Sequence, residues 1–441
     1  MALRRTDDRI PAARRWHPLV LTSSAESATE RPSRATTSAR VRTQLINAVN
    51  HIADASGVFE KPLSAAELIE GAQRRTGLTD FGDRCFEKPL EILAQCYEEE
   101  ANLSAIGRMA ARWDARRFLS SLLRLRDAEK NNPAILDEAI DRPIFITGMP
   151  RSGSTFLHAL LCEDEANRAV RCWETIYPYP AQGGRSGSPE RRQRKVDRQL
   201  AIFAKIAPEL PGLHPISARS PQECTEIMGH VFRSLRFDTT HHVPSYRLWL
   251  DSAGHLAAYR FHKRFLKHLQ HRNGSRRWIL KCPDHVFALK AVRDVYPDAC
   301  FIFLHRDPLE VLASVARLTE VLRRPFTRQV DRLQIGRQVS ERWAHGAAML
   351  VEAAEGGTPS PERVCHINFR RFVENPLLCV AALYERFGLT SSREVETRLR
   401  RFITERPNGG YDPVKARLDE YGLDAQVESR GFRDYMLYFG L

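Results

Sequence analysis

One stretch decides the fold: Pro143-Ile-Phe-Ile-Thr-Gly-Met-Pro-Arg-Ser-Gly-Ser-Thr155. It opens with a short apolar run to Thr147, typical of a buried strand, and a helical pattern follows from Ser154 to Cys162. The loop between them reads G-x-x-x-x-G-S-T from Gly148. Small residues let backbone N–H groups approach phosphate oxygens, and a helix N-terminus adds unpaired donors and a positive dipole end. The stretch therefore predicts a strand, a phosphate-binding loop and a helix.

Similar units of strand and helix recur along the chain. Further strands are expected at 278–281, 300–304 and 364–369. The helices that follow them are expected at about 286–295, 307–322 and 376–387. This alternation predicts an α/β fold, with a P-loop-like, mostly parallel sheet flanked by helices.

Composition and apolar spacing divide the chain into three regions. Residues 1–40, rich in Ser, Thr, Ala and Arg, are expected to form a flexible N-terminal tail, and residues 41–140 a helical N-terminal region. Residues 141–441 form the α/β domain, with a helical cap inserted at about 175–275 over the strand ends, where open α/β sheets bind ligands. The cap is rich in aromatic side chains that either line a binding site or form its own core. These are Phe232, Phe237, Tyr246, Trp249, Tyr259 and Phe261.

The charge balance favours an anionic partner. Lys and Arg total 67 against 54 acidic residues, which gives a net charge of +13. The densest basic run, Arg191-Arg192-Gln193-Arg194-Lys195, reads as one face of a helix. No compact basic run of the nucleic-acid-binding type is present, so we expect no nucleic acid partner.

Cysteine usage and hydropathy indicate a cytoplasmic protein. The nine cysteines show no CxxC pair and no Cys/His cluster that suits zinc, so we expect reduced thiols and no metal site. No apolar run reaches the ~18 residues of a transmembrane helix. A homo-oligomer is compatible with the sequence.

The position of the cation in the phosphate loop limits the chemistry. A nucleoside-triphosphate P-loop carries Lys after its second glycine, but here Ser154 follows Gly153 and the cation, Arg151, lies inside the loop. The hydroxyls of Ser152, Ser154 and Thr155 add further donors.

A second motif follows the strand at 300–304. Arg306 lies at the end of that strand, and Ser314 lies eight residues further on, about two turns into the next helix. An arginine and a serine in this arrangement can grip one phosphate, with the guanidinium as a bidentate donor and the hydroxyl as another.

The two motifs together resemble those of sulfotransferases that use 3′-phosphoadenosine-5′-phosphosulfate (PAPS). Pro150-Arg-Ser-Gly-Ser-Thr155 resembles their 5′-phosphosulfate loop, with Ser154 where Thr is usual, and Arg306 and Ser314 resemble their 3′-phosphate motif. The resemblance, to the bacterial branch of the family, extends over residues 141–435. It implies PAPS as co-substrate, no metal, and cofactor-binding roles for these residues together with Ser152, Gly153 and Thr155.

In-line sulfuryl transfer needs cations at the leaving phosphate and a base at the acceptor hydroxyl. Arg151 and Lys281 are the expected cations. His285 and Glu174 are the candidate bases, with a slight preference for His285 because the pKa of imidazole is matched to neutral pH. The expected acceptor is a small hydroxyl-bearing molecule, and the aromatic cap suggests an apolar or aromatic one.

Two alternatives remain at this point. The first is a kinase or NTPase of the same architecture, which would require Mg²⁺ and lacks the Walker lysine. The second is a non-catalytic module that binds PAPS or nucleic acid.

Overall fold

The computed structural model describes residues 61–179, 188–356, 361–406 and 416–441. The expected tail over 1–40 and the first part of the expected helical region, 41–60, lie outside the described residues. Among the described residues, no helix is long and apolar enough to cross a membrane.

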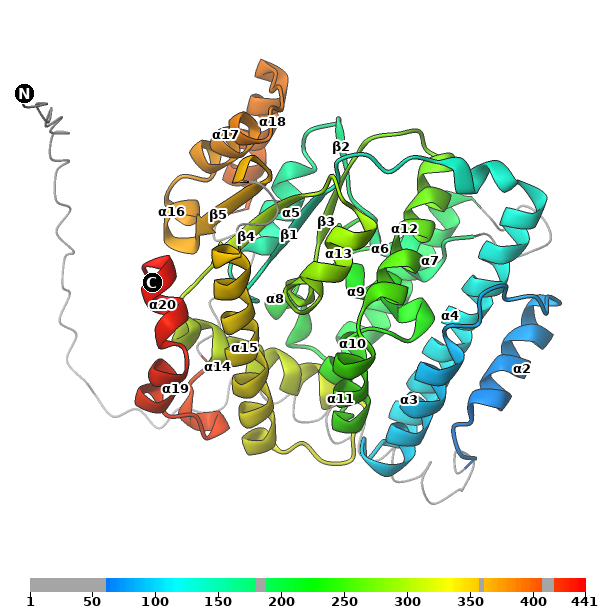
Figure 1. Cartoon of the computed structure of the whole chain (residues 1–441). Helices are drawn as coiled ribbons and strands as arrows, with labels where there is room; N and C mark the ends of the chain where they lie inside the picture. Colours follow the sequence, from blue (N-terminus) through cyan, green and yellow to red (C-terminus); the bar gives the residue numbers. More distant parts are fainter. Residues whose placement is uncertain (1–60, 180–187, 357–360, 407–415) are drawn as a thin grey trace, which may run out of the picture. The chain divides into compact units, whose positions relative to one another are not determined.

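Five parallel strands form one sheet in the order β2-β3-β1-β4-β5 (Figure 1). The strands are β1 (Ile144–Gly148), β2 (Asn167–Arg168), β3 (Arg277–Lys281), β4 (Cys300–His305) and β5 (Val364–Asn368). The chain leaves β1 toward one edge of the sheet and leaves β4 toward the other. The carboxyl ends of these two neighbours therefore mark the topological switch point, where such sheets bind ligands. The predicted α/β class with a parallel sheet is confirmed.

Alternate side chains of the strands enter two different cores. Ile144 and Ile146 pack with α5 (Ser154–Leu161), α17 (Pro376–Arg386) and α18 (Arg393–Glu405) on one face. Phe145 between them points to the other face and joins the larger core. Both faces are covered, which explains why the strands read as continuous apolar runs.

The helices after β3 and β4 begin where the sequence places strong start signals. After β3, Pro283–Ala288 forms a 3-10 turn before α13 (Leu289–Val295), so the α-helix is shorter than expected. After β4, α14 (Pro308–Arg323) has Asp307 as its N-cap, whose carboxylate accepts a hydrogen bond from the backbone N–H of Leu309.

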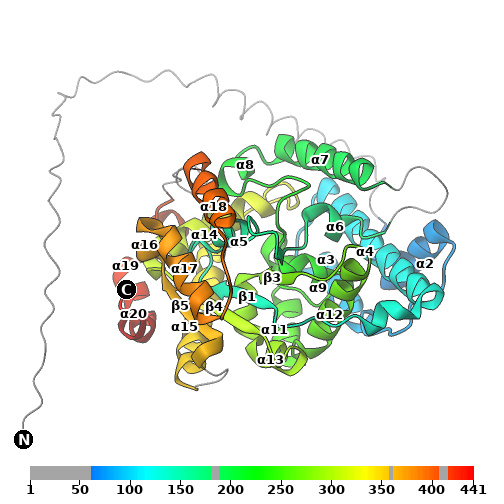
Figure 2. The ribbon, with the colours of Figure 1, turned by 90° about the horizontal axis from the view of Figure 1, so that it is seen from above.

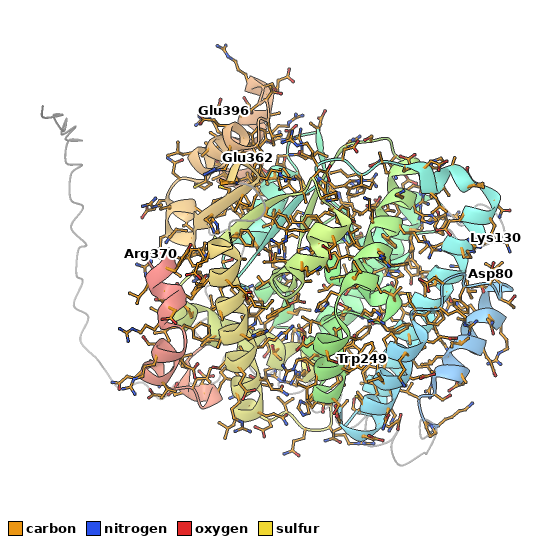
Figure 3. All side chains as sticks on the ribbon, in the orientation of Figure 1. Asp80, Lys130, Trp249, Glu362, Arg370 and Glu396 are labelled. Carbon is orange, nitrogen blue, oxygen red and sulfur yellow. The ribbon has the colours of Figure 1, made fainter. Side chains whose placement is uncertain are left out.

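Three helices form the described part of the N-terminal region: α2 (Ala65–Thr76), α3 (Glu87–Glu99) and α4 (Ala105–Asn131). Figure 3 labels Asp80 and Lys130 on this side of the molecule, where their side chains form an ion pair at 3.2 Å. α4 ends at Asn131, and a 3-10 helix begins at Pro133.

The inserted segment is helical. Its helices are α6 (Cys172–Ile176), α7 (Pro189–Ile206), α8 (Leu210–Leu213), α9 (Cys224–Met228), α10 (Arg236–Thr240), α11 (Pro244–Ala253) and α12 (Leu256–His271). The remaining helices follow β4 and β5, and are α15 (Arg332–Glu355), α16 (Phe369–Glu374), α19 (Ala425–Gly431) and α20 (Arg433–Phe439).

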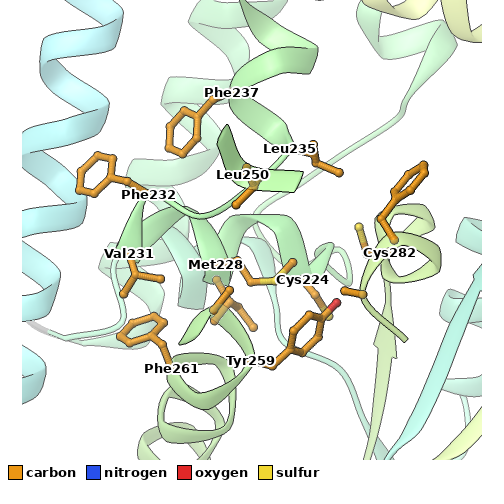
Figure 4. Close-up of a cluster of buried hydrophobic side chains, with 14 of the residues drawn as sticks. Cys224, Met228, Val231, Phe232, Leu235, Phe237, Leu250, Tyr259, Phe261 and Cys282 are labelled. Atoms are coloured by element: carbon orange, nitrogen blue, oxygen red, sulfur yellow. The ribbon is translucent and has the colours of Figure 1, made fainter. Parts of the chain in front are cut away.

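Most of the aromatic side chains of the insertion belong to the protein core. Phe232, Phe237, Tyr259 and Phe261 are buried together with Leu250 (Figure 4). Their exposed fractions do not exceed 4%. The sequence left open whether these residues line a binding site or form a core, and the structure shows that they form core.

Candidate active site

The phosphate loop that joins β1 to α5 contains residues with positive φ. Gly148 has a φ of +129°, and a Cβ on it would lie 2.1 Å from the carbonyl oxygen of Leu304 on β4. Only glycine therefore permits the close approach of the two strands at their carboxyl ends. Arg151 adopts a φ of +60°, which is strained for a residue with a side chain.

The side chain of Arg151 links the loop to α14 and α8. Its Nε donates to Ser314 Oγ at 3.1 Å, and its Nη1 donates to the carbonyl of Leu213 at 2.9 Å. Arg306 Nη1 in turn donates to the carbonyl of Arg151 at 2.6 Å. The two phosphate motifs predicted from sequence thus lie side by side at the switch point.

Arg306 has two further neighbours that affect its availability. Its Nε donates to Glu310 Oε2 at 3.0 Å, one turn into α14. Its guanidinium also stacks on the ring of Phe369, 4.0 Å from the centroid. The aromatic ring fixes the plane of the guanidinium, which a bidentate phosphate contact requires.

Lys281, at the end of β3, approaches the loop from the other side. The register pairs it with Ile146, two residues before Gly148. The side chain is almost fully buried, and its Nζ donates to Thr155 Oγ1 at 2.9 Å and to Glu223 Oε1. A lysine, a threonine hydroxyl and a carboxylate therefore meet beside the first turn of α5.

A cavity of about 1390 Å³ connects these groups. Its polar part includes Arg151, Gly153, Ser154, Thr155, Lys281, Arg306 and Ser314. Its apolar part is built from α4, α7 and α14, with Phe326 beyond α14. Phe203 on α7 and Phe326 stack there, with their ring centroids 5.7 Å apart.

Three residues expected at the site do not line this cavity. Ser152 is fully buried, and its hydroxyl donates to the carbonyl of Met149 within the loop. Glu174 is 4% exposed and caps α6, accepting from the backbone N–H of Arg171 at 2.8 Å and from Arg168 Nη2 at 2.7 Å. These contacts are structural.

His285 is also enclosed. Its ring is fully buried, and Nδ1 is hydrogen-bonded to the hydroxyl of Tyr259. Burial, with the nearby His262 and Lys281, lowers the pKa of His285 well below its usual value. The imidazole is therefore neutral. Unlike its neighbour Asp284, however, His285 does not line the cavity.

Other titratable side chains do line the cavity. Burial raises the pKa of Glu223, but the ammonium of Lys281 outweighs it, so the pKa lies below its ordinary value. Burial also lowers the pKa of His214 to about 4, against an opposing effect of Glu223. Burial raises the pKa of Asp284 to about 7, against the effect of Arg342. At neutral pH the site thus combines the ionised carboxylate of Glu223, the neutral imidazole of His214 and the carboxyl group of Asp284, which is about half ionised.

Sequence reasoning did not identify Glu223 or His214. Both belong to the inserted segment, whose spacing carries no recognisable motif. Within the described residues, no group of three or more His, Cys, Asp or Glu side chains is arranged to hold a metal ion.

The fold and the site define a nucleotide-dependent group-transfer enzyme. The loop after the central strand and the arginine–serine pair after its neighbour line one cavity with donors that suit phosphate groups, and the same cavity has room for an acceptor. A family profile described as "Sulfotransferase family" matches residues 143–393, more than half of the chain. The chain belongs to this family and is a sulfotransferase, for which PAPS is the co-substrate that the family implies. The kinase and the non-catalytic alternatives are therefore wrong.

Two mycobacterial sulfotransferases of known structure are similar. STF1 from Mycobacterium tuberculosis H37Rv shares 29% identity and a TM-score of 0.74, covering 85% of this chain and 100% of that chain. STF9 from Mycobacterium avium shares 25% identity and a TM-score of 0.77, covering 86% and 98%. The omega-hydroxy-beta-dihydromenaquinone-9 sulfotransferase Stf3 of Mycobacterium bovis is 25% identical over 282 residues, which is 60% of this chain and 67% of the relative.

Proposed function

We propose that this sulfotransferase transfers the sulfuryl group of PAPS to the hydroxyl of a largely apolar, lipid-like acceptor. The observation that carries the proposal is the apolar part of the cavity, which is continuous with the part lined by Lys281 and Glu223. Residues from α4, α7 and α14 line it, among them Ile106, Phe203, Leu318 and Leu322. Stf3 is a sulfotransferase of omega-hydroxy-beta-dihydromenaquinone-9, a hydroxyl-bearing lipid of the kind that such a cavity would accept.

The residues present fit PAPS. Arg306 and Ser314 would hold the 3′-phosphate, and the backbone of the loop with Ser154 and Thr155 would hold the 5′-phosphosulfate. PAPS supplies the sulfuryl group and a nucleotide leaving group. Arg151 and Lys281 would stabilise the charge that develops on the leaving phosphate. Since these cations supply the positive charge, we propose that turnover needs no divalent metal, and activity unaffected by EDTA is the expected result.

We propose Glu223 as the base, in place of His285 and Glu174. Its carboxylate lies on the cavity wall and contacts Lys281, which contacts Thr155 in the loop. The geometry therefore favours proton removal from a hydroxyl placed between Glu223 and the loop.

A series of phenols of falling pKa tests the base. An acidic phenol is already ionised and needs no base, so the deficit of Glu223→Gln should shrink along the series. A deficit that shrinks in His285→Ala or Glu174→Gln instead would overturn the assignment to Glu223.

The acceptor class is tested separately with PAPS and a library of alcohols. Chains of increasing apolar length should give rising kcat/KM, and the sulfated products are identified by mass spectrometry. A preference for short, polar alcohols would contradict a lipid-like acceptor.

The protein's compartment is proposed from its thiols. None of the nine cysteines is in a disulfide, and five of them are buried. This supports a reducing compartment, and we propose the cytoplasm.

A further inference from the structure

The outer face of α7 carries a basic stripe beside the mouth of the acceptor cavity. Arg191, Lys195, Arg198, Ile202 and Lys205 are all exposed and follow the spacing i, i+4, i+7, i+11, i+14. At 100° per residue these side chains share one side of the helix. Figure 2 shows α7 outside α6, with its end next to α8. The two acidic residues of α7, Glu190 and Asp197, fall on other sides of the helix.

The mouth of the cavity exposes large apolar side chains next to this stripe. Ile202 is 58% exposed and lines the cavity, although it belongs to the basic stripe. On α4, Met109 and Trp113 lie one turn apart, are each 41% exposed, and line the same cavity. Exposing three such side chains at one opening costs free energy in water unless something covers them.

We infer that the outer face of α7, together with Met109 and Trp113, docks on the surface of a bilayer that contains anionic lipid. The inference rests on the proposed lipid-like acceptor, which would then pass from the bilayer into the cavity without crossing water. Cations beside exposed apolar side chains are the pattern of helices that lie in a membrane interface. The four cations of the stripe would face lipid phosphates, while Ile202, Met109 and Trp113 would enter the acyl boundary.

Charge complementarity favours this occupant over a segment of the same chain. Residues 1–60, which lie outside the described part of the chain, contain nine arginines and six acidic residues. Their net charge has the same sign as the stripe, so they are poorly suited to cover it. An anionic bilayer matches both the charge and the apolar side chains.

Sedimentation of the full chain with lipid vesicles tests the docking without any turnover. The protein should bind vesicles of phosphatidylcholine mixed with phosphatidylglycerol, bind pure phosphatidylcholine poorly, and dissociate in part at high salt. The variant Arg191→Glu/Lys195→Glu/Arg198→Glu replaces three cations that do not line the cavity. Its partitioning onto anionic vesicles should fall by about a hundredfold or more.

A matched variant controls for net charge. Lys290→Glu/Arg430→Glu/Arg433→Glu makes the same change at exposed positions on α13, α19 and α20, away from the cavity lining. It should retain vesicle binding. Equal loss in both triple variants, or no binding by the wild type, would overturn the docking surface, as would equal binding to polyglutamate and to anionic vesicles, since that would indicate an acidic protein partner.

Activity assays separate this inference from the proposed function. The α7 variant should sulfate a short, water-soluble alcohol at the wild-type rate and lose activity only toward an acceptor embedded in vesicles. Vesicle binding by a wild-type protein that sulfates no apolar alcohol would leave the docking intact and reject the proposed acceptor. Equal losses on both acceptors would show that α7 acts on the site itself, against the docking role.

Discussion

Arg306 and Ser314 lie eight residues apart and contact different groups of the same residue, Arg151. Arg306 contacts the carbonyl of Arg151, and Ser314 accepts from the guanidinium of Arg151. We expect Arg306→Ala to weaken the binding of adenosine 3′,5′-bisphosphate by about tenfold to a hundredfold, because it removes charged hydrogen bonds worth about 1.5–3 kcal/mol. Calorimetry measures the change, and Arg401→Ala on α18, outside the cavity lining, serves as the control.

The same experiment can be made sharper with Glu310. This carboxylate accepts a hydrogen bond from Arg306 Nε at 3.0 Å and would repel a phosphate bound by Arg306. Glu310→Gln should therefore tighten nucleotide binding by about threefold, as expected for a partly exposed ion pair. Weaker binding in Glu310→Gln, or unchanged affinity in a folded Arg306→Ala protein, would contradict the 3′-phosphate assignment.

The pH dependence of turnover distinguishes the carboxyl groups of the cavity. A base works only when deprotonated, so activity is lost as the pH falls through its pKa. The pKa of Glu223 lies below its ordinary value, so kcat/KM should show no acid limb near neutral pH. If Asp284 were the base, kcat/KM would halve near its pKa of about 7.

The mutant kinetics give a second measurement of the same assignment. Glu223→Gln should lower kcat by about 10²–10⁴-fold and leave the affinity for adenosine 3′,5′-bisphosphate nearly unchanged. An acid limb at neutral pH that persists in Glu223→Gln and disappears in Asp284→Asn would move the role to Asp284.

Site residues that lie close together in the sequence were predictable from it, and residues far apart in the sequence were not. The loop and the Arg306–Ser314 pair are each fixed by one strand and one helix, so their spacing carries the geometry. Glu223 lies 58 residues before Lys281, and only the packing of the insertion brings the two together. Glu174 carries a carboxylate, as a base requires, but that carboxylate caps α6 and contacts Arg168.

At the scale of elements, α4 forms one wall of the acceptor cavity because it packs closely on the segment after α14. Gly107 lies against Phe326, and a Cβ on Gly107 would lie 2.0 Å from the carbonyl oxygen of Phe326. That carbonyl also accepts from the backbone N–H of Ser104 at 2.9 Å. The glycine therefore sets the distance between α4 and Phe326 of the aromatic pair in the apolar part of the cavity.

Gly107→Ala should destabilise the protein by about 1–3 kcal/mol, because the backbone of Phe326 must move to accept the methyl group. The same shift should raise KM for a long apolar acceptor while leaving nucleotide affinity unchanged. Urea unfolding and steady-state kinetics measure the two effects.

Gly431→Ala is the matched control for this substitution. Gly431 ends α19, and a Cβ there would meet no atom within 4 Å. Alanine should therefore be neutral or slightly stabilising at this position. If Gly107→Ala were as stable as Gly431→Ala, the close packing of α4 would not set the cavity wall.

The longer strands and their helices could be read from sequence because both faces of the sheet are buried, which leaves continuous apolar runs. The two-residue β2 is too short to produce any pattern. The aromatic side chains of the insertion were ambiguous for a physical reason. Phe232 and Phe237 pack on α4, for example through Phe118, and their sequence spacing does not show whether such a partner exists.

At the scale of the whole described molecule, one apolar core joins the N-terminal helices to the sheet. It contains Leu68 of α2, Phe118 of α4, Tyr259 of α12 and Phe145 of β1. Charged contacts cross the same boundary, since the Glu129 carboxylate on α4 binds both Arg264 and His268 of α12. Burial raises the pKa of Glu129, but these two partners lower it to about 2, so the carboxylate is ionised throughout the physiological range.

Such a shared core predicts that nucleotide binding stabilises regions far from the nucleotide. Adenosine 3′,5′-bisphosphate at a hundred times its Kd should raise the free energy of unfolding by about 2.7 kcal/mol. If residues 61–140 and the sheet unfold as one cooperative unit, the most protected amides of α4 and of β4 should slow by the same factor, about a hundredfold, in hydrogen exchange. Arg306→Ala, with the nucleotide at the same concentration, should reduce both effects together. Slowing confined to β4, with α4 unchanged, would show that the N-terminal helices open independently and that the shared core does not couple them to the site.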